Sequence, residues 1–266
     1  VTMVKLFVDG SSATEADLRH QALVNYGAYT SFRVESGGVR GLDLHLARLE
    51  SAAVELFGQA VGDWRLRDLM RSALGPRQDA WLRVSLFSDA LSNREPTAQG
   101  APQVMIGVFE PPSPLTGAVR VQLQVYEREK PHLKHVATFG LLTARRTARA
   151  AGFDDALFVG RDGRISEGSL WNIGFLSGDT IVWPEAPMLS GVTQALLSEG
   201  LRARGVGQTT RPVTVADLSD FSAAFICNSA TPAASIIAIA DRIFEAGPAL
   251  IDRLTETWLS QPLQTI

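Results

Sequence analysis

A proline-rich segment divides the chain and limits what either side of it can form. Residues 110–117 read Glu-Pro-Pro-Ser-Pro-Leu-Thr-Gly, with three prolines in four positions. Proline lacks a backbone N–H and fixes its own φ angle, so this run suits neither a helix interior nor a central strand. A chain of 266 residues is long enough for two domains. The sequence therefore predicts an N-terminal domain over residues 1–110, a linker over 111–117 and a C-terminal domain over 118–266.

Both predicted domains mix helical and strand patterns. In the first, the residue pattern predicts strands over 4–8, 29–34, 81–87 and 104–109, and helices over 14–20, from 43 onwards and over 63–73. In the second, it predicts strands over 119–125, 156–159, 164–166, 171–176, 180–183, 223–227 and 236–239, and helices over 138–151, 192–203 and 249–259. Strands and helices do not alternate strictly, so the pattern favours an α+β fold over a parallel α/β fold.

Charge and composition exclude several classes of partner and site. The net charge is −3, and no basic run or face indicates nucleic acid or a membrane surface. The chain starts like a strand rather than a signal peptide, and no apolar run approaches the ~18 residues of a membrane span. We therefore expect a cytoplasmic protein. The single cysteine, Cys227, lies in an apolar run and is expected to be a buried strand residue rather than a nucleophile.

Common catalytic and metal-binding motifs are absent from the sequence. It contains no GxGxxG, P-loop, GxSxG, HExxH or CxxC pattern. His132 and His135 could share a helix face, but a zinc site needs a third ligand that the sequence does not offer. No metal site is predicted.

Lysine is rare in this chain, and one copy lies in a distinctive segment. Lys5, Lys130 and Lys134 are the only lysines, against 22 arginines. Lys134 lies just before the helix predicted over 138–151. Most lysines are solvated surface charges, but lysine, unlike arginine, can form an imine once its pKa is lowered. Lys134 is therefore a candidate for covalent catalysis.

Three further segments supply what an aromatic aldehyde cofactor with a phosphate tail would need besides that amine. Glu167 follows a predicted strand and could keep a pyridine nitrogen protonated. Gly191 opens the helix predicted over 192–203, whose free N–H groups could bind phosphate. Arg48 lies on an otherwise apolar helix stripe and offers a guanidinium. Each feature has a common structural explanation alone, but together they favour a pyridoxal phosphate site.

With these residues the chain resembles the class IV, or fold-type IV, pyridoxal-phosphate enzymes. These are the branched-chain and D-amino-acid aminotransferases and aminodeoxychorismate lyase. The resemblance covers nearly the whole chain and rests on the order Lys134, then Ser-Glu-Gly-Ser at 166–169, then Gly-Val-Thr at 191–193. It implies two α+β domains, with the cofactor at the domain interface, and usually a homodimer.

The resemblance also implies residue roles. Lys134 forms the Schiff base with pyridoxal 5′-phosphate and moves protons between Cα and the cofactor's C4′, and Glu167 pairs with the ring nitrogen. The implied cofactor residues are Arg48, Lys134, Glu167, Asn172, Val192, Thr193 and Ser229. The candidate substrate residues are Tyr29, Thr30, Ser31, Arg33 and Ala230.

Departures from the family pattern leave the reaction open. The aminotransferases carry a tyrosine five residues after the lysine, where this chain has Phe139. Lys134-His135, Thr30-Ser31 before Arg33 and the Phe-Ile-Cys-Asn run at 225–228 match the lyase branch instead. We expect an amino-acid aminotransferase acting on an amino acid and a 2-keto acid. The alternatives are 4-amino-4-deoxychorismate lyase, which yields 4-aminobenzoate and pyruvate, another reaction of the same cofactor, and a non-catalytic module of the same fold.

Overall fold

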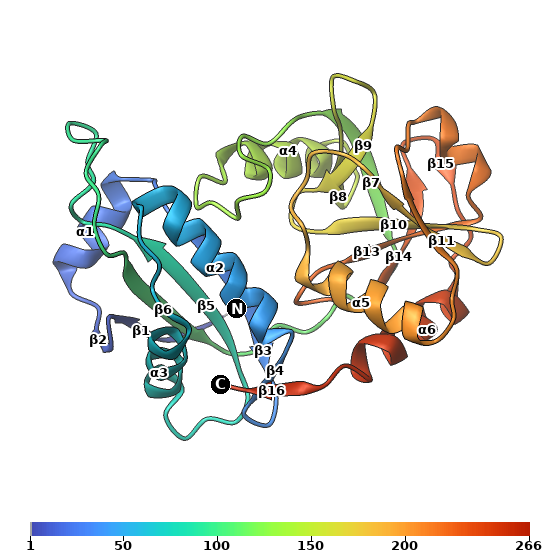
Figure 1. Cartoon of the computed structure of the whole chain (residues 1–266). Coiled ribbons are helices and arrows are strands. Elements are labelled where there is room, and N and C mark those ends of the chain that lie inside the picture. Colours follow the sequence, from blue (N-terminus) through green and yellow to red (C-terminus); the bar gives the residue numbers. More distant parts are fainter. Residues whose placement is uncertain (1) are drawn as a thin grey trace. The chain divides into compact units, whose positions relative to one another are not determined.

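The computed structural model describes residues 2–266 and divides into two compact units (Figure 1). One comprises Val1–Pro112, Leu133–Ala137 and Pro262–Ile266, and the other comprises Ser113–His132 and Thr138–Gln261. The division after Pro112 lies inside the predicted linker. Leu133–Ala137 and Pro262–Ile266 lie later in the chain but belong to the first unit. The sequence prediction used one linker as the only boundary and so assigned both segments to the C-terminal domain.

The first unit is built on an antiparallel sheet with two helices on one face. Its helices are α1 (Glu15–Leu23), α2 (Leu42–Phe57) and α3 (Asp63–Leu74). Its strands are β1 (Met3–Val8), β2 (Ser11–Ser12), β3 (Ala28–Val34), β4 (Gly38–Arg40), β5 (Ala80–Phe87), β6 (Gln103–Phe109) and β16 (Leu263–Thr265). The sheet order is β2-β1-β6-β5-β3, and β16 pairs separately with β4. Helices α2 and α3 pack on this sheet, and the apolar side chains between them form the core.

Helix α2 buries a face that differs slightly from the predicted one. The apolar spacing of this helix predicts a buried stripe of Leu44, Leu46, Leu49, Ala52, Ala53 and Leu56, but Leu44 is exposed, while Leu42 and His45 are buried instead. Leu46, Leu49, Ala52 and Ala53 are buried as expected. The polar His45 is thus part of the buried face, which hydropathy alone could not indicate.

The second unit is a mixed sheet that closes on itself. Its strands are β7 (Val119–Val125), β8 (Asp155–Val159), β9 (Ile165–Gly168), β10 (Asn172–Ser177), β11 (Thr180–Pro184), β12 (Gln208–Arg211), β13 (Ala223–Cys227), β14 (Ala234–Ile239) and β15 (Arg242–Ile243). Strands β10, β13, β14, β7, β8 and β9 follow one another, and β9 pairs again with β10. These strands form a closed ring, a barrel-like arrangement whose interior is filled by apolar side chains.

Helices cover the outside of this ring. Helix α4 (Phe139–Ala150) packs on β8, whereas α5 (Val192–Ala203) and α6 (Pro248–Leu259) lie side by side against strands β11 and β13 (Figure 1). A short 3-10 helix spans Ala216–Asp220. Cys227 is fully buried here, and burial raises the pKa of its thiol to about 12. This confirms the prediction of a buried strand cysteine.

The predicted helices and strands are confirmed, with boundaries within a few residues. Helix α1, for example, begins after Thr14, whose side chain and that of Asp17 form a reciprocal capping box. The short strands β2, β4, β12, β15 and β16 were not predicted. They lack the alternating apolar pattern because each is only two to four residues long.

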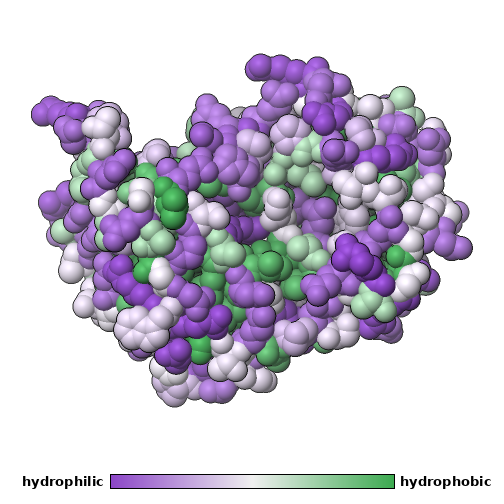
Figure 2. Space-filling model, in the orientation of Figure 1, coloured by the Kyte–Doolittle hydropathy of each residue, from purple (hydrophilic) through white to green (hydrophobic). Residues whose placement is uncertain are grey.

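The molecular surface is mixed in character. The face seen in Figure 2 is mainly hydrophilic, with hydrophobic side chains gathered in smaller areas, as is ordinary for folded proteins. Within residues 2–266, no helix combines the length and the apolar character that crossing a membrane requires.

Candidate active site

The predicted site residues divide between the two units. The first unit holds Tyr29, Thr30, Ser31, Arg33, Arg48 and Lys134, and the second holds Glu167, Asn172, Val192, Thr193, Ser229 and Ala230. Within each unit they gather on neighbouring segments.

Backbone hydrogen bonds fix Lys134 against the start of β3. The N–H of Tyr29 donates to the carbonyl oxygen of Lys134 at 2.8 Å, and the N–H of Val136 donates to that of Gly27 at 2.9 Å. The Nζ atom of Lys134 lies 5.0 Å from the centre of the Tyr29 ring. Residues 133–137 are therefore anchored to the first unit. Because this pairing is long-range, the local residue pattern gave no signal for it.

Next to these residues lies a buried histidine that sequence reasoning did not select. The Nδ1 atom of His45 lies 2.6 Å from the Oγ1 atom of Thr30, and its ring lies 4.8 Å from that of Phe32. Burial lowers the pKa of His45 well below 6.5, and the positive charges of Arg48 and Lys134 lower it further. His45 is therefore neutral at pH 7. The available sequence signal was its position three residues before Arg48, on the same helix face.

The alternation of β3 separates the candidate substrate residues. Thr30 lies on the face that packs on α2, where its hydroxyl is already engaged. Tyr29, Ser31 and Arg33 lie on the opposite face. There the guanidinium of Arg83 lies 3.7 Å from the centre of the Tyr29 ring, and Arg83 is paired in register with Ser31. Arg83 was not selected from the sequence, although the alternation of side chains along β5 indicates which face of the sheet it lies on.

In the second unit, Glu167 is a buried acid with a cationic neighbour. The Oε1 atom of Glu167 lies 3.4 Å from Nη1 of Arg128 and accepts a hydrogen bond from the N–H of Leu189 at 3.2 Å. The side chains of Glu167 and Arg128 are only 5% and 6% exposed. A buried carboxylate needs such partners to stay charged. Arg128 had no motif to mark it in the sequence, since it lies in a run of alternating charges.

Arg128 also lines a pocket in this unit. The pocket has a volume of about 460 Å³. Its lining residues are Val125, Tyr126, Glu127, Arg128, Glu129 and Arg161. Both charge signs are represented in the lining, so the pocket does not select one sign of ligand.

Asn172 and Gly191 hold the start of α5 in place. The Nδ2 atom of Asn172 donates to the carbonyl of Leu189 at 2.9 Å. A Cβ atom at Gly191 would overlap the Asn172 amide, so the close approach requires glycine. Val192 and Thr193 form the first turn of α5 beyond it, where backbone N–H groups point outward.

Thr193 offers an unused buried hydroxyl at that helix end. Its side chain is 2% exposed, and its Oγ1 atom has no hydrogen-bond partner within residues 2–266. Buried polar atoms are nearly always paired, so an unpaired one indicates a missing ligand group or water. A helix N-terminus with a free hydroxyl is suited to a phosphate.

A turn in the second unit carries Ser229 and Ala230. The Oδ1 atom of Asn228 accepts hydrogen bonds from the N–H groups of Ala230 and Thr231 at 2.9 and 2.8 Å. The Nδ2 atom of Asn228 donates to the carbonyl of Leu170 at 3.3 Å. The turn carrying Ser229 is thereby joined to the segment that follows Glu167.

Phe139 is the first residue of α4, and its side chain is 82% exposed. Its ring therefore lies at the surface. The sequence shows that this position lacks the tyrosine hydroxyl of the aminotransferases, and the structure shows that the side chain is mostly exposed to solvent.

Comparison with known proteins gives the family. The model of the family described as "Amino-transferase class IV" matches residues 27–239, most of the chain. The chain belongs to the class IV amino-transferase family. Membership in this family indicates pyridoxal 5′-phosphate as cofactor. The family expected from the motifs is thus confirmed.

Individual relatives are more distant. A probable branched-chain-amino-acid aminotransferase from Rickettsia felis is 27% identical over 99 residues, which are 37% of this chain and 34% of that protein. The match thus spans about a third of the relative's length. A branched-chain aminotransferase from Thermoproteus uzoniensis has a TM-score of 0.81 and 20% identity, with 97% of this chain and 94% of that chain covered. The corresponding values for a 4-amino-4-deoxychorismate lyase from Pseudomonas aeruginosa are 0.81, 24%, 94% and 97%. At these identities the two structures establish the fold, as expected from the sequence.

The described residues fit this cofactor. Thr193 has an unpaired buried hydroxyl at a helix N-terminus, and Glu167 is a buried acid, the kind of group that a pyridine nitrogen pairs with. Lys134 carries an amine, the kind of group that an aldehyde requires. Residues 2–266 contain no group of three or more His, Cys, Asp or Glu side chains arranged to hold a metal ion.

Proposed function

We propose that the protein is a pyridoxal-phosphate-dependent aminotransferase that exchanges an amino group between an amino acid and a 2-keto acid. The observation that carries this proposal is the buried Glu167, held by Arg128 and the Leu189 N–H, in a class IV chain that retains Lys134. Burying such an acid costs free energy unless it meets a partner.

Lys134 is the residue that takes up and returns protons. When bound, pyridoxal phosphate withdraws electrons from the amino acid and so makes its Cα proton acidic. Lys134 removes that proton from Cα and delivers it to C4′ of the cofactor. Arg48 and the neutral His45 lie nearby. A neutral imidazole suits this role, because an imidazolium would add a further positive charge beside those of Arg48 and Lys134. Lys134 must lose its own proton before it can act.

Glu167 keeps a proton on the cofactor's ring nitrogen. A carboxylate facing that nitrogen favours the protonated ring, which is the better electron acceptor. Arg128 and Leu189 hold the carboxylate in one orientation by two contacts to its Oε1 atom. The second carboxylate oxygen is thereby oriented as well.

Phosphate recognition is assigned to the start of α5 in the second unit, with Ser229 of that unit and Arg48 of the first unit as further donors. The N–H groups of the first turn at Val192 and Thr193, the hydroxyl of Thr193 and the guanidinium of Arg48 provide donors suited to a dianion. Ser229 adds a hydroxyl on a turn fixed by Asn228. On the substrate side, Tyr29, Ser31 and Arg33 share one face of β3, and Thr30 and Ala230 remain further candidates.

The second candidate function is 4-amino-4-deoxychorismate lyase. Phe139 lacks the hydroxyl found in the aminotransferases, and Lys134-His135 and the Phe-Ile-Cys-Asn run at 225–228 match the lyase branch. In that reaction Lys134 would remove the Cα proton, pyruvate would be expelled and 4-aminobenzoate would form. The fold is compatible with both reactions, since solved structures of either kind match it.

A spectral titration separates the two functions. The cofactor-loaded protein is mixed with a panel of L- and D-amino acids without any keto acid, and its visible absorption is recorded. An aminotransferase converts the bound cofactor to its pyridoxamine form with at least one donor, and a 2-keto acid reverses the change. If no donor converts it, the aminotransferase proposal fails, and release of 4-aminobenzoate from aminodeoxychorismate tests the lyase.

Location and assembly are part of the same proposal. A cytoplasmic homodimer is expected from the family resemblance. Light scattering of the purified protein across a dilution series measures its mass and tests the dimer.

A further inference from the structure

The turn between β9 and β10 joins two candidate cofactor residues. Glu167 near the end of β9 and Asn172 at the start of β10 are paired in register. The N–H of Gly168 donates to the carbonyl of Trp171 at 2.9 Å, which closes the turn. A Cβ atom at Gly168 would overlap the Trp171 indole, so the indole lies directly against the backbone beside Glu167.

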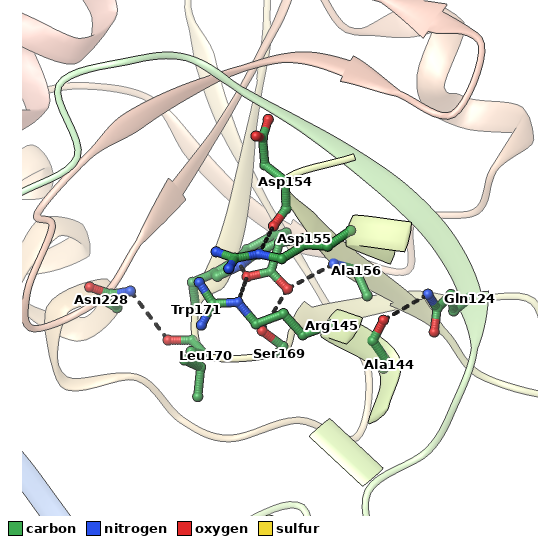
Figure 3. A network of polar contacts seen from close by, with 11 residues as sticks. Gln124, Ala144, Arg145, Asp154, Asp155, Ala156, Ser169, Leu170, Trp171 and Asn228 are labelled. Carbon is green, nitrogen blue, oxygen red and sulfur yellow. Dashed lines mark hydrogen bonds and ion pairs between the residues drawn. The ribbon is translucent and has the colours of Figure 1, made fainter. Parts of the chain in front are cut away.

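One buried carboxylate holds this turn from both ends (Figure 3). The Oδ1 atom of Asp155, the first residue of β8, accepts a hydrogen bond from Oγ of Ser169 at 2.6 Å. Its Oδ2 atom accepts one from Nε1 of Trp171 at 3.1 Å. The Nε atom of Arg145 on α4 forms an ion pair with the same Oδ2 at 3.5 Å. The backbone N–H of Ala156 donates to Oδ1 at 2.8 Å.

These contacts reach beyond the turn itself. In Figure 3 the carbonyl of Leu170, at the tip of the turn, accepts the hydrogen bond from Asn228. At the base of the turn, Glu167 and Asn172 both form hydrogen bonds with the backbone of Leu189, just before α5. The turn is therefore the common support of the segments that carry Glu167, Ser229 and the start of α5.

We propose that Asp155 is a positioning residue that fixes Glu167 toward the cofactor's ring nitrogen by clamping Ser169 and Trp171. The inference rests on the proposed function. Asp155 is buried on the side of the turn away from Asn228, so it acts through the turn and not on the cofactor itself. Without the hydrogen bonds from Ser169 and Trp171 to Asp155, the end of β9 and the start of β10 can move. Glu167 then contacts the ring nitrogen for a smaller fraction of the time.

Asp155→Asn is the informative substitution because it preserves size. An asparagine can still accept from Ser169, but its amide N–H₂ then faces the donors of Trp171 and Arg145. We expect pyridoxal phosphate to bind roughly tenfold more weakly, as one broken buried hydrogen bond would cause. The absorption maximum of the bound cofactor should also shift. Asp154→Asn is the matched control, since it removes the same charge one residue away, from a side chain that bonds the N–H of Arg120 instead.

A double-mutant cycle with Glu167→Gln distinguishes positioning from a general structural role. If Asp155 acts through Glu167, Asp155→Asn should weaken cofactor binding by less than about twofold in the Glu167→Gln background. A purely structural role predicts the same loss in both backgrounds and an unshifted absorption maximum, and either result overturns the inference. Should Asp155→Asn fail to fold, Ser169→Ala and Trp171→Phe, which each remove one donor, replace it in the cycle. A wild-type protein that does not bind pyridoxal phosphate would instead overturn the proposed function.

Discussion

The Nη1 atom of Arg128 lies 3.4 Å from the Oε1 atom of Glu167, and both side chains are more than nine-tenths buried. Two opposite charges out of water stabilise each other strongly, but each becomes costly when its partner is removed. The pair thus holds a carboxylate in a place where no carboxylate would be stable alone. That arrangement suits an acid that also pairs with a ring nitrogen once the cofactor is bound.

Arg128→Met should therefore destabilise the cofactor-free protein by roughly 3–5 kcal/mol. Pyridoxal phosphate should restore part of that loss, since the protonated ring nitrogen gives Glu167 a new partner. Thermal unfolding with and without the cofactor measures both effects. The control is Arg161→Met, because Arg161 lines the same pocket but its side chain is 87% exposed. Equal cofactor stabilisation of the wild type and of Arg128→Met would contradict the pairing.

Lys134→Ala should remove the visible absorption band of the cofactor-loaded protein while leaving the protein folded. The side chain carries the amine that the aldehyde requires, whereas the hydrogen bonds that anchor this segment come from the backbone. Turnover should fall by at least 10²–10⁴-fold, the usual contribution of a proton-transferring group. Lys5→Ala, at an exposed lysine of the first unit, is the control. A band that survives in Lys134→Ala would remove this residue from the mechanism.

Much of the fold follows from local sequence patterns. The helices, the longer strands and the linker near Pro112 have strong signals, namely apolar periodicity, capping residues such as Thr14 and prolines. The return of residues 133–137 to the first unit has none, because a pairing with β3 depends on chain segments about a hundred residues apart. The closed ring in the second unit likewise depends on the contact between β9 and β10.

The site shows the same division. Lys134, Glu167 and Arg48 stand in segments whose residue types and order could be selected from the sequence. Arg128 and Asp155 stand in no such motif, and only the fold shows which polar groups are buried beside them. The alternation of side chains along β3 could be predicted from the sequence, but the contact between Thr30 and His45 is seen only in the structure.

Acid should destabilise the protein in part through His45. Its pKa in the folded protein lies well below 6.5, so below that pH the unfolded chain binds more protons than the folded one. Stability therefore falls as the pH drops from about 6.5 toward the folded-state pKa, by up to about 1.4 kcal/mol for each pH unit. Urea unfolding between pH 5 and pH 8 should show a smaller dependence in His45→Gln than in the wild type. Thr30→Val keeps the histidine and should keep the slope, although it removes the hydroxyl partner. An unchanged slope in His45→Gln would show that His45 already charges within the folded protein.

Two neighbouring positions on α4 should respond very differently to truncation. The Phe139 side chain is 82% exposed, whereas that of Leu141 is 4% exposed and packs against β8. Leu141→Ala should cost about 2–5 kcal/mol through lost burial and a cavity, while Phe139→Ala should change the unfolding free energy by no more than about 0.5 kcal/mol. Phe139→Tyr should likewise leave stability unchanged, since its added hydroxyl would lie in solvent. Urea unfolding of the three variants measures these differences. A large cost for Phe139→Ala would mean that its ring is covered in solution, and light scattering of the same sample would then show whether a second copy of the chain covers it.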